Sequence, residues 1–329
     1  MLPSRRLTGL VLFLAVAGYA LGGGGRLALA VLTDSRSVAA TVTTAACFSE
    51  DDVAPSVTGT VVSKSTPYLP GYIRQGGTYH VYANVTDDGC TPSGVATVRA
   101  NVGTVTTGET AVSLAPGAFS IGGASYGYRT ESITANATLA EGASTYSLTA
   151  EDAAGNAGTQ SGFSVIVDNT SPAGADVQTT NGGSTVGSPE LGDTVTLTFS
   201  EVIDPHSVLA GWTGQTTDVV ARITNGLTMD VLTIRNAANT VQIPLGSISL
   251  GGGGYVSATR DFGATGTAST MVQSGNAITI TLGTASGTVG TDLLPDEMVW
   301  TPSSTATDSA GNACRTSLTL ESGLLDLEF

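Results

Sequence analysis

From about residue 57 onward, the sequence is a succession of short segments in which apolar and polar residues alternate. Residues 79–85 read Tyr-His-Val-Tyr-Ala-Asn-Val, and residues 195–201 read Val-Thr-Leu-Thr-Phe-Ser-Glu. A β-strand places successive side chains on opposite faces, so a strand that is buried on one face needs this period of two. Glycine, asparagine and aspartate lie between the segments, where turns require them. The pattern predicts an all-β chain.

The composition agrees with strands and argues against the main alternatives. Charged residues make up 12% of the chain, about half the usual share, whereas long amphipathic helices need many of them on the solvent side. Hydrophobic residues make up 41%, which leaves enough apolar surface to bury and disfavours disorder despite the 43 glycines. A length of 329 residues has room for two domains, each with its own core.

The alternating segments between residues 55 and 171 are short and closely spaced. They are residues 57–62, 79–85, 95–100, 111–114, 130–137, 146–150 and 163–167. Short strands at this spacing, separated by turn residues, are typical of an immunoglobulin-like (Ig-like) β-sandwich. We therefore expect a first Ig-like domain over residues 55–171.

One stretch of this domain resembles a known family. Residues 146–156 read Tyr-x-Leu-x-Ala-x-Asp-x-Ala-Gly-Asn, which is similar to the F strand and F–G turn of bacterial Ig-like repeat domains of cell-surface, surface-layer and adhesion proteins. The resemblance implies that Tyr146 is a tyrosine corner, whose hydroxyl bonds to nearby backbone. It also implies a setting at the bacterial cell surface.

A second Ig-like domain is expected over residues 172–329. Residues 168–172, Asp-Asn-Thr-Ser-Pro, resemble the joints between tandem bacterial Ig-like domains, and residues 192–201 resemble the opening of such a domain. The Asp-x-Ala-Gly-Asn turn recurs at residues 308–312, which is an internal repeat. Further strands are expected at residues 219–223, 231–234, 277–282 and 298–300. The excess length around residues 235–275 predicts an extra hairpin or loops.

Residues 1–30 have the features of a cleavable signal peptide. Arg5 and Arg6 precede an apolar stretch that is too short to span a membrane, and residues 28–30 form an Ala-x-Ala cleavage signal. Residues 22–35 contain four glycines followed by Ala-Leu-Ala-Val-Leu-Thr-Asp-Ser, and they resemble the processing region of TasA/camelysin-like matrix proteins, with leucine in place of the usual aromatic residue. That resemblance implies a fibre or an extracellular matrix.

A leader segment, residues 31–54, is expected between the signal peptide and the first domain. The sequence after it contains no second apolar segment of spanning length and no Leu-Pro-x-Thr-Gly sorting signal. We therefore expect a protein that is secreted and stays extracellular or cell-surface associated, with no transmembrane anchor after processing.

Three cysteines suit an oxidising compartment and leave one without an intramolecular partner. The favoured pairing is Cys47 with Cys90, which would tie the leader to the first domain. Cys314 is then either free or paired between molecules. Neither a Cys-x-x-Cys motif nor a Cys/His metal set is present.

The net charge of −15 constrains the partners. An anionic surface repels phosphate backbones and anionic lipid headgroups, so nucleic-acid binding is excluded and binding to anionic membranes is disfavoured. Removal of residues 1–30 makes the chain more negative still, because that segment holds three arginines and no acid. The same charge attracts cations.

The two Asp-x-Ala-Gly-Asn turns are the candidate metal sites. Asp152 and Asn156 in the first domain, and Asp308 and Asn312 in the second, place carboxylate and amide oxygens in one turn, which suits Ca²⁺. The acidic pair at residues 87–88 could add ligands in the first domain. The alternative is that the turns are hairpins held by Asx hydrogen bonds, with no ion. No organic cofactor is expected.

Catalysis is disfavoured by the residues available. The two histidines, His80 and His206, are far apart, and His80 is predicted to face solvent from a strand. No Gly-x-Ser-x-Gly nucleophile elbow is present. Glu201 and Asp204 are close enough in sequence to serve as a glycosidase pair, but nothing indicates a substrate cleft beside them.

The expected function is structural or adhesive, exerted by rigid tandem domains that bind themselves, other cell-surface proteins or polysaccharides. Edge strands with few charged residues could be extended by another chain. One alternative is a polysaccharide-binding module, Ca²⁺-assisted, in which Trp212, Trp300, Tyr126 and Tyr128 stack on sugars. The other is a hydrolase with Ig-like accessory domains, although no segment is left to house a catalytic fold.

Overall fold

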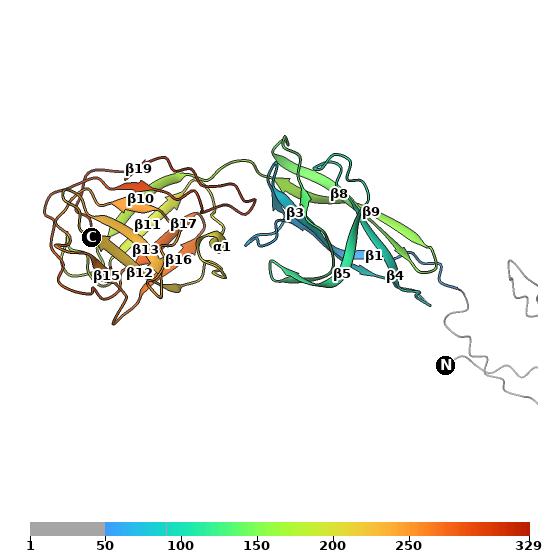
Figure 1. Cartoon of the computed structure of the whole chain (residues 1–329), viewed down its shortest axis with the longest axis horizontal. Coiled ribbons are helices and arrows are strands. Elements are labelled where there is room, and N and C mark those ends of the chain that lie inside the picture. Colours follow the sequence, from blue (N-terminus) through green and yellow to red (C-terminus); the bar gives the residue numbers. More distant parts are fainter. Residues whose placement is uncertain (1–49, 90) are drawn as a thin grey trace, which may run out of the picture. The chain divides into compact units, whose positions relative to one another are not determined.

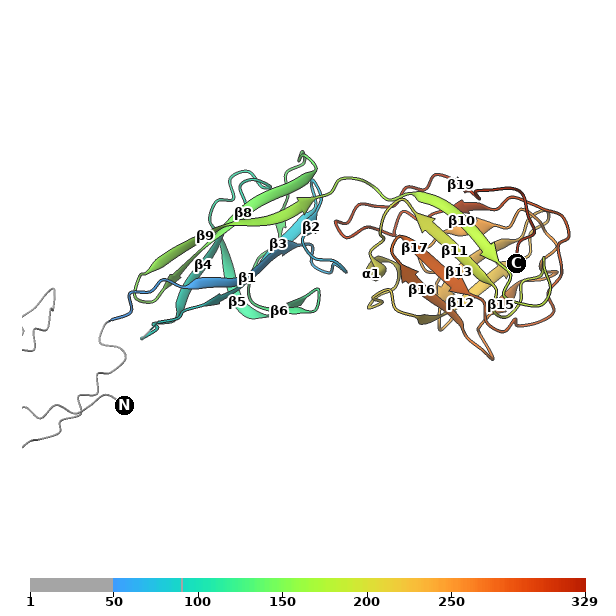
Figure 2. The same ribbon diagram turned by 180° about the vertical axis from the view of Figure 1, so that it is seen from behind.

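The computed structural model describes residues 50–329 with the exception of residue 90. This part of the chain is all-β apart from one single-turn helix, and it forms two domains, each with its own sheet (Figures 1 and 2). The predicted signal peptide, the leader up to residue 49 and both members of the Cys47–Cys90 pair lie outside the described residues. Among the described residues, no helix is long and apolar enough to cross a bilayer.

The first domain contains nine strands drawn from residues 56–167. They are β1 (Ser56–Ser63), β2 (Tyr72–Ile73), β3 (Thr78–Thr86), β4 (Val95–Asn101), β5 (Val112–Ile121), β6 (Ala124–Thr130), β7 (Ile133–Thr134), β8 (Gly142–Asp152) and β9 (Ala157–Val167). Their order is β1-β3-β6-β5-β4-β8-β9-β2, and β7 pairs with β3. All pairs are antiparallel except β2 with β9.

This sheet closes nearly on itself. Strand β1, at one end of the path, contacts β9 and β2 at the other end. No ladder of backbone hydrogen bonds joins β1 to β9. Instead, the Val57 amide donates to the side-chain oxygen Oε1 of Gln160 at 2.6 Å, and this bond connects the two ends of the sheet. The core inside contains Tyr79, Val81 and Leu148, all 0% exposed.

The second domain contains ten strands and helix α1, drawn from residues 174–320. They are β10 (Gly174–Thr180), β11 (Thr194–Phe199), α1 (Pro205–Val208), β12 (Thr217–Thr224), β13 (Val231–Asn236), β14 (Ser247–Ser249), β15 (Arg260–Phe262), β16 (Ser269–Ser274), β17 (Ala277–Thr281), β18 (Val299–Thr301) and β19 (Thr319–Leu320). Their order is β10-β11-β17-β16-β12-β13-β14-β18-β19, with β15 paired to β12. Contacts of β10 with β18 and β19 bring the two ends of this path together as well.

In this domain, the alternation of apolar and polar residues in the sequence matches the alternation of buried and half-buried side chains in the strands. Along β11, Val195, Leu197 and Phe199 point inward and are at most 1% exposed, while the threonines between them are half-buried. Phe199 packs edge-on against Trp300, with ring centroids 4.8 Å apart. The Trp300 indole donates to the Leu245 carbonyl at 2.7 Å, so the one polar atom of this fully buried side chain is satisfied.

The prediction of one strand over residues 130–137 is wrong. Strand β6 ends at Thr130, and β7 is a separate two-residue strand, Ile133–Thr134. Thr130 and Ile133 are both buried although they lie three residues apart. A single pleated strand with a period of two cannot turn both inward, so the chain must break between them.

Two side-chain predictions in the first domain are also wrong. His80 is 8% exposed, with its ring nitrogens bonded to the Thr130 carbonyl and the Ser65 hydroxyl, because β3 is covered on both faces. The Tyr146 hydroxyl donates to Thr60 Oγ1 on β1 at 3.2 Å and not to the nearby backbone that a tyrosine corner requires. In the second domain, the extra length around residues 235–275 forms strands β14, β15 and β16.

Replacing Leu197 by alanine is expected to destabilise the second domain by about 2–5 kcal/mol, since a fully buried leucine leaves a cavity. The same substitution at Leu191, which is 53% exposed in the same domain, is expected to change the unfolding free energy by less than about 0.5 kcal/mol. Chemical denaturation of the two variants measures both values. Equal effects would contradict the burial assigned to β11.

Candidate metal centres

The Asp-x-Ala-Gly-Asn turn of the first domain joins the end of β8 to the start of β9. Asp152 is 2% exposed, and its two carboxylate oxygens accept from the Asn156 backbone amide and side-chain amide, each at 2.8 Å. Gly155 has a φ of +92°, a conformation that favours glycine and lets the chain reverse within this short turn. The motif therefore forms the Asx-bonded turn expected from sequence.

The side chain of Asn156 also reaches outside the turn. Its amide nitrogen donates to the main-chain carbonyl of Asp51 at 2.9 Å, across 105 residues of sequence. The Asp51 carboxylate in turn accepts from the Ser93 amide at 2.8 Å, and hydrogen bonds from the side chain of Ser93 and then from its amide lower the pKa of Asp51. The segment that leads into β1 is thus fastened to the β8–β9 turn.

Asp87 follows directly after β3 and completes a group of carboxylates with Asp51 and Asp152, here called the first triad. One oxygen of each side chain lies within 4.8 Å of the others. Asp87 Oδ2 accepts from the Gly94 amide at 2.6 Å, whereas its Oδ1 is buried and has no hydrogen-bond partner among the described residues. A buried carboxylate oxygen without a donor indicates room for a cation.

The second turn repeats this geometry. Asp308 is 2% exposed and accepts from the backbone amides of Gly311 and Asn312 and from the Asn312 side chain, at 2.7–2.8 Å. Gly311 has a φ of +95°, matching the glycine of the first turn. The Asn312 amide nitrogen also donates to the main-chain carbonyl of Asp168 at 2.8 Å, across 144 residues.

Asp168, Glu201 and Asp308 form the second triad, again with one oxygen each within 4.8 Å of the others. Burial, followed by repulsion from Asp168 and Asp308, raises the pKa of Glu201 to about 7. Burial, followed by the charge of Asp308, also raises the pKa of Asp168. Glu201 Oε1 is buried without a partner in the described part of the chain, as Asp87 Oδ1 is in the first triad.

The two triads correspond position by position. Asp51 and Asp168 each stand four residues before a proline, ahead of the first strand of their domain. Asp87 and Glu201 each follow the strand that pairs with that first strand, which is β3 in one domain and β11 in the other. The third carboxylate opens the repeated turn. The internal repeat therefore extends from the turn to a complete group of acids.

The donor set fits a hard divalent cation. Ca²⁺ binds carboxylate and carbonyl oxygens at about 2.3–2.6 Å, so two ligands of one ion lie at most roughly 5 Å apart. The 4.8 Å limit that both triads satisfy falls inside this range. The Asn156 and Asn312 amide nitrogens donate to the triad aspartates, so these predicted site residues position the carboxylates through hydrogen bonds.

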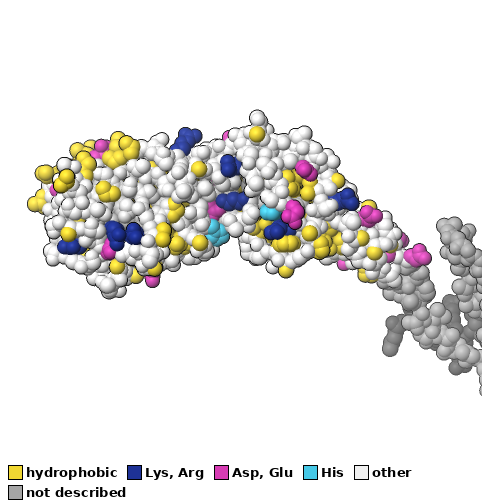
Figure 3. Space-filling model, in the orientation of Figure 1, with side chains coloured by type: hydrophobic (Ala, Val, Ile, Leu, Met, Phe, Trp, Pro, Cys, Tyr) yellow, Lys and Arg dark blue, Asp and Glu magenta, His cyan; other side chains and the backbone are white. Residues whose placement is uncertain are grey.

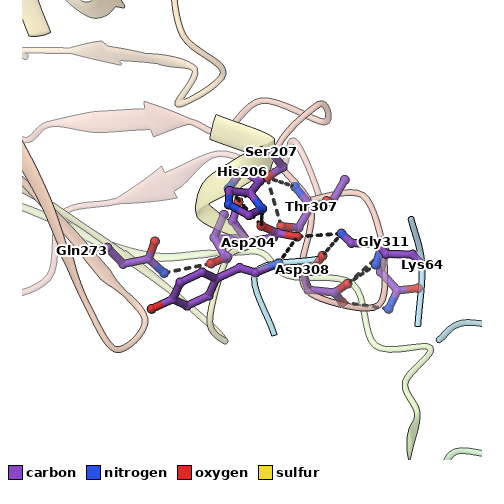
Figure 4. Close-up of polar contacts among 11 residues, drawn as sticks. Lys64, Asp204, His206, Ser207, Gln273, Thr307, Asp308 and Gly311 are labelled. Atoms are coloured by element: carbon purple, nitrogen blue, oxygen red, sulfur yellow. Dashed lines mark hydrogen bonds and ion pairs between the residues drawn. The ribbon is translucent and has the colours of Figure 1, made fainter. Parts of the chain in front are cut away.

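The second triad lies beside a contact between the two domains. Lys64, from the end of β1, donates to the Asp308 carbonyl at 2.9 Å and pairs with Asp204 Oδ2 at 2.8 Å (Figure 4). Asp204 also caps α1 by accepting from the His206 amide at 2.9 Å, with proline at the first helical position. The Ser207 hydroxyl donates to the Asp204 carbonyl and so adds a further bond to this contact.

The remaining predicted site residues lie outside the two triads. Asp88 is exposed and accepts from Thr86 at 3.0 Å, outside the first triad. Trp212 and Trp300 are 5% and 0% exposed, so they are core residues, and the alternative in which they stack on sugars is wrong. Cys314 is a free thiol that is 2% exposed, so a bridge to another molecule would require the domain to open.

Sequence reasoning missed Asp51 and Asp168 as site residues, and it considered Glu201 only as half of a glycosidase pair with Asp204, which it disfavoured. In the structure Glu201 joins the second triad, while Asp204 is engaged by Lys64. A signal for the two aspartates existed in the Asp-x-x-x-Pro pattern before each domain.

No family model matches this chain, and a search among curated proteins found no relative.

Removing the side-chain amide of Asn156 or of Asn312 is expected to lower the unfolding free energy of the corresponding domain by a similar amount. Asn156→Ala and Asn312→Ala each lose the bonds to a triad carboxylate and to the lead-in carbonyl, so each should cost about 1–3 kcal/mol of unfolding free energy. Ala153→Ser, an exposed change within the first turn, serves as the control. A loss confined to one domain would contradict the correspondence of the triads.

Glu201 makes the stability of the second domain depend on pH. Between pH 4.5 and about 7 the folded domain keeps a proton at Glu201 that the unfolded chain has released, so stability falls as pH rises through this window. Glu201→Gln is expected to flatten the fall, measured as melting temperature against pH in a chelator. Glu297→Gln removes an exposed charge from the same domain and should leave the slope unchanged.

Proposed function

We propose that this protein is a secreted or cell-surface structural protein of non-enzymatic character, built from tandem Ig-like domains whose joints are stiffened by Ca²⁺. One observation carries the proposal: both domains hold a carboxylate triad at the same place, and in both the triad includes an aspartate of the segment that leads into the domain. Sites so placed serve the connection between domains.

The residues around the second triad explain how a joint is stiffened. Asp168 belongs to the segment between β9 and β10, and its carbonyl is held by Asn312. The Asp308 turn that contains Asn312 also accepts from Lys64 of the first domain. Ca²⁺ would neutralise the mutual repulsion of Asp168, Glu201 and Asp308 and bind all three at once. Holding Asp168 in place would then limit the movement of the segment between β9 and β10, which connects the two domains.

The strand pairing supports the Ig-like part of the proposal. In the first domain, β1 pairs antiparallel with β3, while β2 pairs parallel with β9. Strands β4, β8 and β9 are antiparallel neighbours, as the C, F and G strands of an Ig-like sandwich are. Strand β5 pairs with β4 through its first residues and with β6 along most of its length, and so connects the two faces.

The surface supports partner binding through side chains. Figure 3 shows a face on which charged side chains are scattered among uncharged and backbone atoms. Several leucines of the second domain are more than half exposed, namely Leu191, Leu227, Leu293, Leu294, Leu318, Leu320, Leu324 and Leu325. Exposed apolar side chains in this number favour contact with another copy or another surface protein. Near-closure of both sheets leaves little free edge, so β-augmentation has less support.

Polysaccharide binding has less support as the main function, because both tryptophans are buried. What favours it is a surface hollow of about 420 Å³ in the first domain, lined by Phe119, Tyr126 and Asn84 among others. The hydrolase alternative loses its carboxylate pair, since Asp204 is held by Lys64 and by the α1 turn. We therefore place structural assembly first.

Ca²⁺ is expected to change the size or the shape of the processed protein in solution. Chromatography with in-line light scattering and X-ray scattering, run in chelator and in millimolar Ca²⁺, measures mass and shape together. We expect Ca²⁺ to give either larger assemblies or a monomer with a narrower distribution of domain arrangements. Glu201→Gln should abolish the change in shape, and Glu297→Gln should not.

A monomer with the same scattering curve in both conditions, which also fails to bind cells, polysaccharides or itself, would contradict the proposal. Assembly that is independent of Ca²⁺ would support the matrix function and remove the metal from it.

A further inference from the structure

A third group of acids lies in the second domain, outside the Asp-x-Ala-Gly-Asn turn of residues 308–312. Glu321, Asp326 and Glu328, here called the C-terminal cluster, place one carboxylate oxygen each within 4.8 Å of the others. Glu321 follows β19 directly, and the other two lie in the segment after it. Nothing in the repeat predicts this cluster.

Glu328 is the innermost member. Its side chain is 0% exposed, and Oε2 accepts from Thr179 Oγ1 of β10 at 2.6 Å. Oε1 is buried and meets no N–H or hydroxyl donor within residues 50–329, residue 90 aside, and the side chain of Glu328 shares a hydrogen bond with the carboxyl group of Glu321. A buried carboxylate that meets two further carboxylates needs either such a shared proton or a cation to offset the negative charge.

The charges around the cluster are negative. Burial raises the pKa of Glu328, and the neighbouring Glu321 and Asp326 raise it further. Burial also raises the pKa of Glu321, with added repulsion from Asp326 and Asp176. Of the ion pairs found in the described part of the chain, none involves a member of the cluster. The protein itself supplies no visible counter-charge.

The segment that carries the cluster is held closely to the sheet. The Phe329 amide donates to Thr179 Oγ1 at 3.2 Å, and the Phe329 carbonyl accepts from Gly187 at 2.8 Å. The Phe329 ring packs edge-on against Tyr255, with centroids 5.8 Å apart. Glu328 and Phe329 are both buried in this segment, and the Glu328 carboxylate lies beside those of Glu321 and Asp326.

We propose that Glu321, Asp326 and Glu328 bind one divalent cation of the Ca²⁺ type, which fastens the segment after β19 to β10. All three ligands are carboxylates, the donors that hard cations prefer. The site is separate from the two triads and does not depend on the proposed function.

The test counts Ca²⁺ ions bound by the full chain, by calorimetric titration after chelator treatment. The wild-type chain should bind three. Glu328→Gln keeps an acceptor for Thr179 and removes the charge, so it should bind two with the fold intact. Asp326→Asn changes an exposed residue and should weaken this site at least about tenfold. Glu297→Gln is the matched control and should bind three.

A double variant, Asp87→Asn with Glu201→Gln, separates this inference from the proposed function. It should retain one Ca²⁺ ion, which the further change Glu328→Gln removes. If the wild-type chain binds two ions that the double variant loses and Glu328→Gln keeps, the C-terminal site is overturned while the triads stand. If the wild-type chain binds none, the C-terminal site fails together with the Ca²⁺ part of the proposed function.

Discussion

The hydrogen bond from an asparagine side chain to a distant main-chain carbonyl determines how each domain begins. Asn156 holds Asp51, and Asn312 holds Asp168, while the same two amides orient the buried carboxylates of Asp152 and Asp308. One amide group therefore couples a turn to the segment that leads into the domain. The triads exist because this bond draws the lead-in aspartate to the end of the barrel-like sheet.

The distribution of charge follows from the same arrangement. The chain carries few charged residues, yet acids concentrate in three groups, two of which combine segments distant in sequence. Such concentration costs folding free energy unless a proton or a cation relieves the repulsion, as the raised pKa values of Glu201 and Glu328 indicate. The secreted setting that we propose would supply Ca²⁺ for this. Folding and cation binding are then linked.

The joint between the domains combines both effects. Lys64 pairs with Asp204 and also donates to the carbonyl of Asp308, so one side chain of the first domain contacts both the capped helix turn and the Asp308 turn of the second domain. Because Asp204 is 0% exposed, leaving it unpaired would be costly. Lys64 therefore favours one arrangement of the joint, and the second triad fixes the segment beside it.

The sequence alone determined the period-two strands, the two-domain all-β organisation and the Asx turns, because these depend on residues close together along the chain. It did not separate residues 130–137 into two strands or bury His80, since both results depend on which strands cover β3. Asp51, Asp87 and Asp152 come together through strand pairing, as Asp168, Glu201 and Asp308 do, and pairing register is a property of the folded sheet. Only the tertiary structure could assign Glu328 its buried carboxylate, because its burial depends on Phe329 packing against Tyr255 and Thr179.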